Sequence, residues 1–189
     1  DCYFQEPEKQ CPYHNLTFPT GTPDQGRKVI EAFQKTFGAN AAAQLLVWAL
    51  GGHLKTIIGF WPHMELQADK GAGKSTLIKR MERAIAYTML SGQSTQSDFR
   101  LLTSVSHTAH PVGWEEISAR KQQVIAAAVA LLQESYQYTV TRRGSDMVEY
   151  LLSAPVLLAG EDVPVVSLTG KIVRASLRIK GEMIPDELP

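Results

Sequence analysis

Residues 68–76 read Ala68-Asp69-Lys70-Gly71-Ala72-Gly73-Lys74-Ser75-Thr76, which fits the pattern Gly/Ala-x4-Gly-Lys-Ser/Thr of a phosphate-binding loop. The two glycines let the backbone curl, so that successive N–H groups can point inward at phosphate oxygens. A helix that begins at Lys74 would add its unpaired N–H groups and the positive end of its dipole. We therefore expect Lys74 to reach the β and γ phosphates of a nucleotide and the Ser75 hydroxyl to bind Mg²⁺.

The segments on either side of this loop support the same interpretation. Met64 to Gln67 predicts a short strand, and Lys74 to about Leu90 predicts an amphipathic helix. A strand, a glycine-rich loop and a helix in this order make up the P-loop unit. The sequence therefore predicts a nucleotide site at Ala68–Thr76, with ATP and Mg²⁺ as the expected ligands.

Two adjacent carboxylates follow the next candidate strand, His110 to Trp114. Hydrolysis assisted by magnesium needs a carboxylate beside the metal and a base that orients the attacking water. We assign Glu115 to the metal side, where Asp is usual, and Glu116 to the base. Gly113 is expected to weaken the strand. The alternative is an acidic pair that caps the helix starting at Ile117.

The order of the predicted elements indicates an α/β fold. Thr22 and Gln25 form a capping box that starts a helix ending at Gly38, and a second helix runs through 41–54. Apolar strands at 155–159 and 172–179 then follow a long helix at 117–136, a pattern that favours a buried, mostly parallel sheet. We expect a three-layer P-loop NTPase fold in one domain, 23–189. Residues 23–56 form its helical lead-in, 57–189 its nucleotide-binding core, and 1–22 an irregular N-terminal arm.

Composition limits the other classes of function. The chain is 44% hydrophobic with a formal net charge of +0, so a nucleic-acid partner would have to meet a local basic patch. No apolar run approaches the ~18 residues of a membrane span, and the two cysteines favour a reducing, cytoplasmic location. Cys2, Cys11 and His14 resemble part of a zinc set, but a packed or mobile arm is the better interpretation. Because the chain begins at Asp1 rather than Met, we expect it to be part of a longer protein.

Basic residues near the end of the chain offer a further candidate. A planar, permanently charged guanidinium suits the stabilisation of a γ-phosphate across a subunit boundary. We choose Arg174 for such an arginine finger, with a solvated basic strand face as the alternative. Glu161, at the end of the 155–159 strand, is a weaker candidate for orienting water.

The ordered segments resemble the AAA+-like ATPase module of phage and mobile-element primase-helicases. The resemblance covers roughly residues 40–180 and rests on segments 68–76, 94–102, 111–116, 158–162 and 171–174. Only the phosphate loop is specific by itself. The resemblance implies an AAA+/ASCE-like form of the P-loop NTPase fold, and a ring-forming motor that uses ATP to move along or open single- or double-stranded DNA.

A predicted hairpin fits this resemblance. Two β-prone runs at 138–141 and 147–150 flank a Gly-containing turn with Arg142 and Arg143. In related viral ring helicases a hairpin before the sensor strand carries basic residues into the central channel. The resemblance therefore implies that Arg142 and Arg143 contact DNA phosphates, and an ordinary exposed turn is the alternative.

Two other classes of function remain open from the sequence. One is a nucleotide-gated assembly or scaffold protein that hydrolyses ATP slowly, which the irregular Gly113 and Glu115 would allow. The other is a P-loop phosphotransferase, although the Glu115–Glu116 pair favours hydrolysis over transfer.

Overall fold

The computed structural model describes residues 20–85, 88–117, 121–160 and 166–178. Two helices come first, α1 (Pro23–Phe37) and α2 (Ala39–Gly52), where the sequence predicts helices. Thr22 and Gln25 form the expected capping box, with the Thr22 N–H donating to Gln25 Oε1 at 2.8 Å. Gly38 separates the two helices at φ +89°, a conformation that glycine adopts without a steric penalty.

The core is a five-stranded parallel sheet with the order β2-β3-β6-β1-β7. In that spatial order, the strands are β2 (Thr88–Leu90), β3 (Val112–Glu115), β6 (Val156–Ala159), β1 (His63–Ala68) and β7 (Ile172–Leu177). Strand β6 lies between β1 and β3, with Leu66 paired to Ala159 and Ala159 paired to Glu115. Both β1 and β3 therefore end at the same edge of the sheet, one strand apart.

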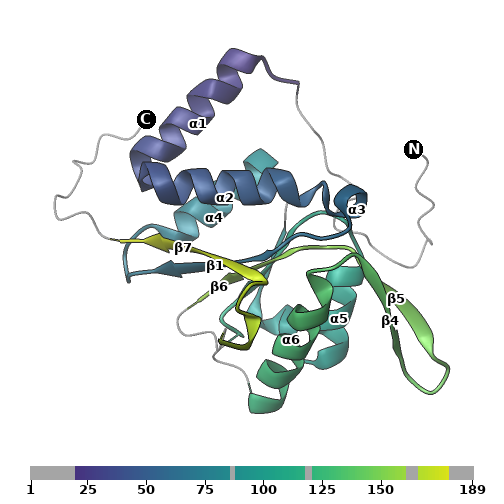
Figure 1. Cartoon of the computed structure of the whole chain (residues 1–189). Helices are drawn as coiled ribbons and strands as arrows, with labels where there is room; N and C mark the ends of the chain where they lie inside the picture. Colours follow the sequence, from purple (N-terminus) through teal and green to yellow (C-terminus); the bar gives the residue numbers. More distant parts are fainter. Residues whose placement is uncertain (1–19, 86–87, 118–120, 161–165, 179–189) are drawn as a thin grey trace.

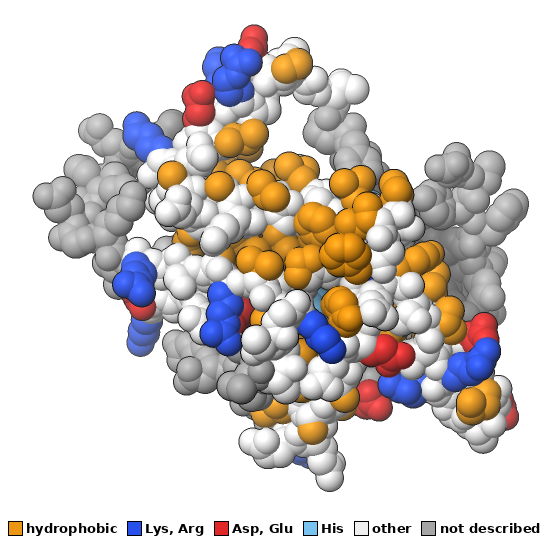
Figure 2. Space-filling view, in the orientation of Figure 1, with side chains coloured by type: hydrophobic (Ala, Val, Ile, Leu, Met, Phe, Trp, Pro, Cys, Tyr) orange, Lys and Arg blue, Asp and Glu red, His pale blue; other side chains and the backbone are white. Residues whose placement is uncertain are grey.

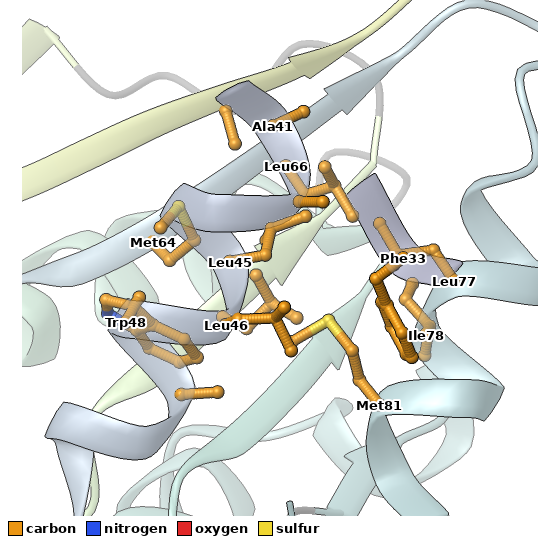
Figure 3. Packing of buried hydrophobic residues seen from close by; sticks show 14 of the residues in the cluster. Phe33, Ala41, Leu45, Leu46, Trp48, Met64, Leu66, Leu77, Ile78 and Met81 are labelled. Atoms are coloured by element: carbon orange, nitrogen blue, oxygen red, sulfur yellow. The ribbon is translucent and has the colours of Figure 1, made fainter. Parts of the chain in front are cut away.

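Helices cover both faces of this sheet, which confirms the three-layer α/β prediction (Figure 1). One face packs against α1, α2 and α4 (Lys74–Ile85), and the other against α5 (Asp98–Ser106) and α6 (Gln122–Ser135). Strand β1 places Met64 and Leu66 in the first of these layers, where they meet Leu45 of α2 and Leu77 of α4 (Figure 3). Because side chains alternate along a strand, Glu65 faces the other layer.

Several predicted boundaries were wrong. The helix expected to reach Leu90 ends at Ile85, and Thr88–Leu90 is the edge strand β2. The described part of the helix expected from Ile117 begins at Gln122. Two short helices, α3 (Lys55–Ile58) and α5, were not predicted, and neither were the single-turn helices at Gly92–Thr95 and Val166–Leu168. The strand expected at 172–179 ends at Leu177.

The predicted hairpin is present as β4 (Thr139–Arg143) and β5 (Val148–Leu152), paired antiparallel. Its base is joined to the segment before β1, because the Tyr138 N–H donates to Gly59 O at 2.9 Å and Phe60 bridges Gln137. Since that segment precedes β1, the hairpin starts from the amino edge of the sheet, opposite to the edge where β1 and β3 end. Its tip projects away from the sheet (Figure 1).

A polar cluster inside the fold ties the amino ends of the strands to the helices. The fully buried Lys55 ammonium donates to the backbone oxygens of Ser135 and Ala154. His63 Nδ1 accepts from the Val156 N–H at 3.1 Å, and its Nε2 lies 3.0 Å from Leu132 O. Burial lowers the pKa of Lys55 to about 7, and burial together with nearby Lys55 lowers the pKa of His63 to about 3. Both side chains therefore link β1, β6, α3 and α6, and their burial makes their charged forms less stable.

One surface of the described part of the chain is largely apolar and exposed. We call it the α2–α3 face, and it consists of Val47, Leu50, Leu54, Ile57, Ile58 and Phe60. Figure 2 shows hydrophobic side chains gathered over these helices. Among the described helices, none is long and apolar enough to cross a membrane.

Candidate nucleotide site

The loop between β1 and α4 has the geometry that the sequence predicts. β1 ends at Ala68 and α4 begins at Lys74, which leaves residues 69–73 as the connection. Gly71 and Gly73 take φ values of +85° and +87°, which favour glycine over any other residue. The Ala72 N–H donates to Asp69 O at 3.0 Å, and the Asp69 N–H donates to Leu177 O at the end of β7 at 3.1 Å. The loop is therefore a tight turn anchored to the sheet.

The side of the loop where phosphate would bind is open. Asp69, Lys70 and Gly71 are exposed, and so are Ser75 and Thr76 in the first turn of α4. No hydrogen bond or ion pair joins the Lys74 ammonium to another described residue. The first N–H groups of a helix have no intrahelical partner and carry its positive partial charge. Free N–H groups, an ammonium and a hydroxyl thus gather at one point, a donor set that fits the phosphates of a nucleotide and Mg²⁺.

The acidic pair lies at the same edge of the sheet. Glu115 is level with Leu66, two residues before the end of β1, and one strand separates the two. Adjacent strands are about 4.8 Å apart, so the Cα atoms of β1 and β3 are separated by about 10 Å. Since Val112 and Trp114 pack in the α5–α6 layer, Glu115 points to the opposite face, where α4 lies. This direction brings its carboxylate toward the side of the sheet that carries Ser75.

Two contacts fix the position of this pair. The Trp114 indole donates to Ser104 Oγ of α5 at 2.9 Å, which anchors the end of β3. The Glu116 N–H donates to Ala159 O at 3.0 Å, so the backbone pairing continues one residue past the strand. Glu116 itself is exposed and has φ +51°, a left-handed conformation that is unfavourable for a residue with a side chain. The chain turns sharply here and leaves the Glu116 carboxylate in solvent.

The structure places Arg174 in an unexpected pairing. It lies on β7 opposite Glu65 of β1, and its Nε is 2.9 Å from Glu65 Oε2. Glu65 is almost completely buried, and the Gln67 amide donates to its other oxygen at 3.0 Å. Within the described residues Oε2 accepts no hydrogen bond, so the contact with Arg174 is an ion pair without an aligned N–H. The guanidinium that the sequence suggested as an arginine finger therefore has a partner, Glu65, within its own chain.

Glu65 itself was missed by the sequence reasoning. Its signal was an acidic residue between two apolar strand residues, Met64 and Leu66, a position where a carboxylate needs a cationic partner. That partner, Arg174, is more than a hundred residues away along the chain, and only the register between β1 and β7 brings the two together.

The two hairpin arginines differ in their surroundings. Arg142 lies opposite Glu149 and donates to its Oε1 from Nη2 at 2.7 Å and from Nε at 3.0 Å. Arg143 donates from Nη1 to the Arg142 carbonyl at 3.3 Å, and its side chain has no carboxylate partner among the described residues. Both lie on the hairpin that starts at the amino edge, so the structure does not bring them to the phosphate loop.

Some predicted residues lie outside the described ranges. Cys2, Cys11, His14 and Glu161 belong to this group. Within the residues that the structure does describe, no three His, Cys, Asp or Glu side chains gather as a metal site.

Comparison with known proteins adds little to this picture. No protein-family model matches the chain, and no curated protein matches it in sequence. Among solved structures, it is similar to a RuvB variant from Thermotoga maritima, with 15% sequence identity and a TM-score of 0.43. The match covers 79% of this chain and 45% of the RuvB chain, so this chain matches less than half the length of that protein. At this level of similarity, the assignment of a P-loop α/β fold rests on the strand order and on the loop between β1 and α4.

Proposed function

We propose that this chain binds ATP with Mg²⁺ at residues 68–76 and hydrolyses it. The observation that carries the proposal is the position of the Glu115–Glu116 pair at the same sheet edge as the open phosphate loop. Lys74 would neutralise the β and γ phosphates, while the N–H groups of Gly71, Gly73 and the first turn of α4 would hold their oxygens in place. A loop of this kind without a nearby carboxylate would support binding but not hydrolysis.

The acidic pair supplies the remaining groups. Magnesium, when bound, would withdraw charge from the phosphate oxygens, and Ser75 together with Glu115 would hold it. The exposed Glu116 carboxylate would accept a proton from the water that attacks the γ-phosphorus, as the bond to the ADP oxygen breaks. Its left-handed backbone supports this role, since strained residues are concentrated at functional sites.

The decisive measurement is phosphate release from ATP by three proteins: the wild-type chain, Lys74→Ala and Glu116→Gln. We expect Lys74→Ala to lose nucleotide binding. Glu116→Gln should bind ATP with unchanged affinity but release phosphate at least a hundredfold more slowly, as expected for loss of a general base. Unchanged ATP affinity in Lys74→Ala would remove the loop from the site. An active Glu116→Gln would remove Glu116 from the role of base.

We further propose that the ATPase drives a DNA-directed motor, assembled as a homo-oligomeric ring of the primase-helicase kind. The resemblance of the ordered segments supports this step, together with a hairpin that presents Arg142 and Arg143 at its tip. Single-stranded DNA should stimulate phosphate release. Stimulation supports the motor, tight ATP binding without turnover would indicate a scaffold, and phosphate transfer only to a small acceptor would indicate a phosphotransferase. An arginine-finger role for Arg174 across a subunit boundary stays a prediction, and its side chain is 54% exposed beside Glu65.

A further inference from the structure

The last residue of α1 lies against the phosphate loop. A Cβ atom built on Gly73 would be 3.4 Å from Cε1 of the Phe37 ring and 3.8 Å from its Cδ1. The ring is partly buried and stacks at a tilt on Phe33, with 5.9 Å between the ring centroids. Phe33 packs in turn beside Leu77 and Ile78 of α4 (Figure 3). The loop is thus connected to the core through two phenylalanines of the lead-in helix.

This contact adds to the two backbone hydrogen bonds of the loop, from the Asp69 N–H to Leu177 O and from the Ala72 N–H to Asp69 O. Ala72 and Gly73 are partly buried, whereas Asp69, Lys70 and Gly71 are exposed. Two glycines in five residues give the loop a large conformational freedom in the absence of packing. Gly73 also accepts the first hydrogen bond of α4, from the Leu77 N–H at 2.9 Å. A ring that fixes Gly73 therefore fixes the point where the loop becomes the helix.

The contact is also where α1 joins the rest of the protein. Phe33 is the only buried residue of α1, while Val29 and Ile30, one turn earlier, are 43% and 44% exposed. The described contacts of α1 are concentrated at its carboxyl end, just before Gly38 turns the chain into α2. A change in the position of α1 would therefore reach the loop through Phe37.

We propose that Phe37 is a positioning residue that holds Gly73, and with it the N–H groups of the loop, in the phosphate-binding conformation. The inference rests on the proposed nucleotide site and adds a residue outside the phosphate-loop motif. Phe37 acts through packing on Gly73. Its loss costs nucleotide affinity because the open loop must then be ordered when the ligand binds.

The experiment compares the wild-type chain with Phe37→Ala, Phe37→Leu and a control, Leu46→Ala. Leu46 belongs to the same buried cluster but lies on α2. The measurements are the Kd for a fluorescent ATP analogue with Mg²⁺, the melting temperature, and amide hydrogen exchange without nucleotide. Phe37→Ala should weaken binding by about tenfold and speed exchange at 69–75, while Phe37→Leu stays close to wild type. Leu46→Ala should lower the melting temperature and leave both loop measurements unchanged.

Two results would overturn the inference. One is a Phe37→Ala protein that binds the analogue as tightly as wild type and keeps slow exchange in the loop. The other is a Leu46→Ala protein that loses nucleotide affinity in the same proportion to its loss of stability as Phe37→Ala does. Phe37 would then be an ordinary core residue. Lys74→Ala, measured in parallel, separates these results from a failure of the nucleotide site itself. If Lys74→Ala binds the analogue like wild type, the proposed nucleotide site is wrong. The exchange measurement then still tests whether Phe37 holds the loop.

Discussion

At the scale of single residues, Gly113 is a position where a side chain from the neighbouring strand fills the space that a Cβ atom would need. The sequence suggested that Gly113 weakens its strand, yet it sits inside β3, paired with Met89 of β2. A Cβ on Gly113 would lie 1.7 Å from the Met89 sulfur, so the methionine fills the space that a side chain would need. Gly113→Ala should lower the free energy of unfolding by about 1–3 kcal/mol, as overpacking does.

Urea denaturation of Gly113→Ala, Met89→Ala and the double variant checks this prediction. Because the alanine methyl would occupy space vacated by the shortened side chain, Gly113→Ala should cost less in the Met89→Ala background than in wild type. Equal costs in the two backgrounds would show that Met89 moves aside freely.

Lys55 gives a pH prediction. Its pKa is lowered by burial from 10.5 to about 7, so between these values the unfolded chain binds more protons than the folded one. Stability should therefore rise as the pH increases from about 7 to about 10, by a few kcal/mol. His63, with a pKa lowered to about 3 from 6.5, titrates below this range in both states. Urea denaturation across the range should show a steeper rise for wild type than for Lys55→Met, and parallel curves would contradict the assignment.

At the scale of elements, the β4–β5 hairpin separates its two arginines. The Glu149 carboxylate neutralises Arg142 across the hairpin, whereas Arg143 has no such partner among the described residues. We expect Arg143→Ala to weaken single-stranded DNA binding more than Arg142→Ala, and more visibly at low salt. The exposed ion pair should add little to stability. Glu149→Ala frees Arg142 and should strengthen DNA binding, measured by fluorescence anisotropy. Equal DNA affinities for wild type and these three variants would show that the hairpin is an ordinary exposed turn.

Elements with strong local signals could be predicted, and those set by distant contacts could not. The capping box at Thr22, the glycine at 38 and the alternation around the hairpin turn are all encoded within a few residues. Strand β2 has three residues and follows a helical pattern, so nothing local distinguishes it from a last helical turn. It is a strand because Met89 packs against Gly113 of β3, a partner outside the reach of local reasoning.

At the scale of the whole molecule, the order of motifs along the chain was enough to place the loop and the acidic pair at one edge. Parallel strands put their carboxyl ends together, so two motifs that follow strands must meet. The same reasoning could not place Arg174 or Phe37. Their partners, Glu65 and Gly73, depend on the register of β7 and on the angle at which α1 meets the core. Functional residues that follow the ends of strands can therefore be predicted from the sequence, whereas those whose position depends on tertiary packing cannot.

The α2–α3 face makes a prediction for the molecule as a whole. Replacing a residue that makes few contacts in the folded state changes the free energy of unfolding little. Leu50 and Ile57 are such residues, since they are 55% and 77% exposed. The double variant Leu50→Gln with Ile57→Gln should change the free energy of unfolding by no more than about 0.5 kcal/mol per site. It should also reduce the binding of a hydrophobic dye and raise the solubility limit, because exposed apolar patches favour association.

Leu45→Gln is the matched control, since Leu45 lies on the same helix but is fully buried against the sheet. It should lose several kcal/mol, because an unpaired amide replaces an apolar side chain in the core. If the double variant loses as much stability as Leu45→Gln, the α2–α3 face is covered in solution by a part of the protein or by a partner. A small loss together with reduced dye binding means that these residues face water, so that α2 packs on the sheet through one side only.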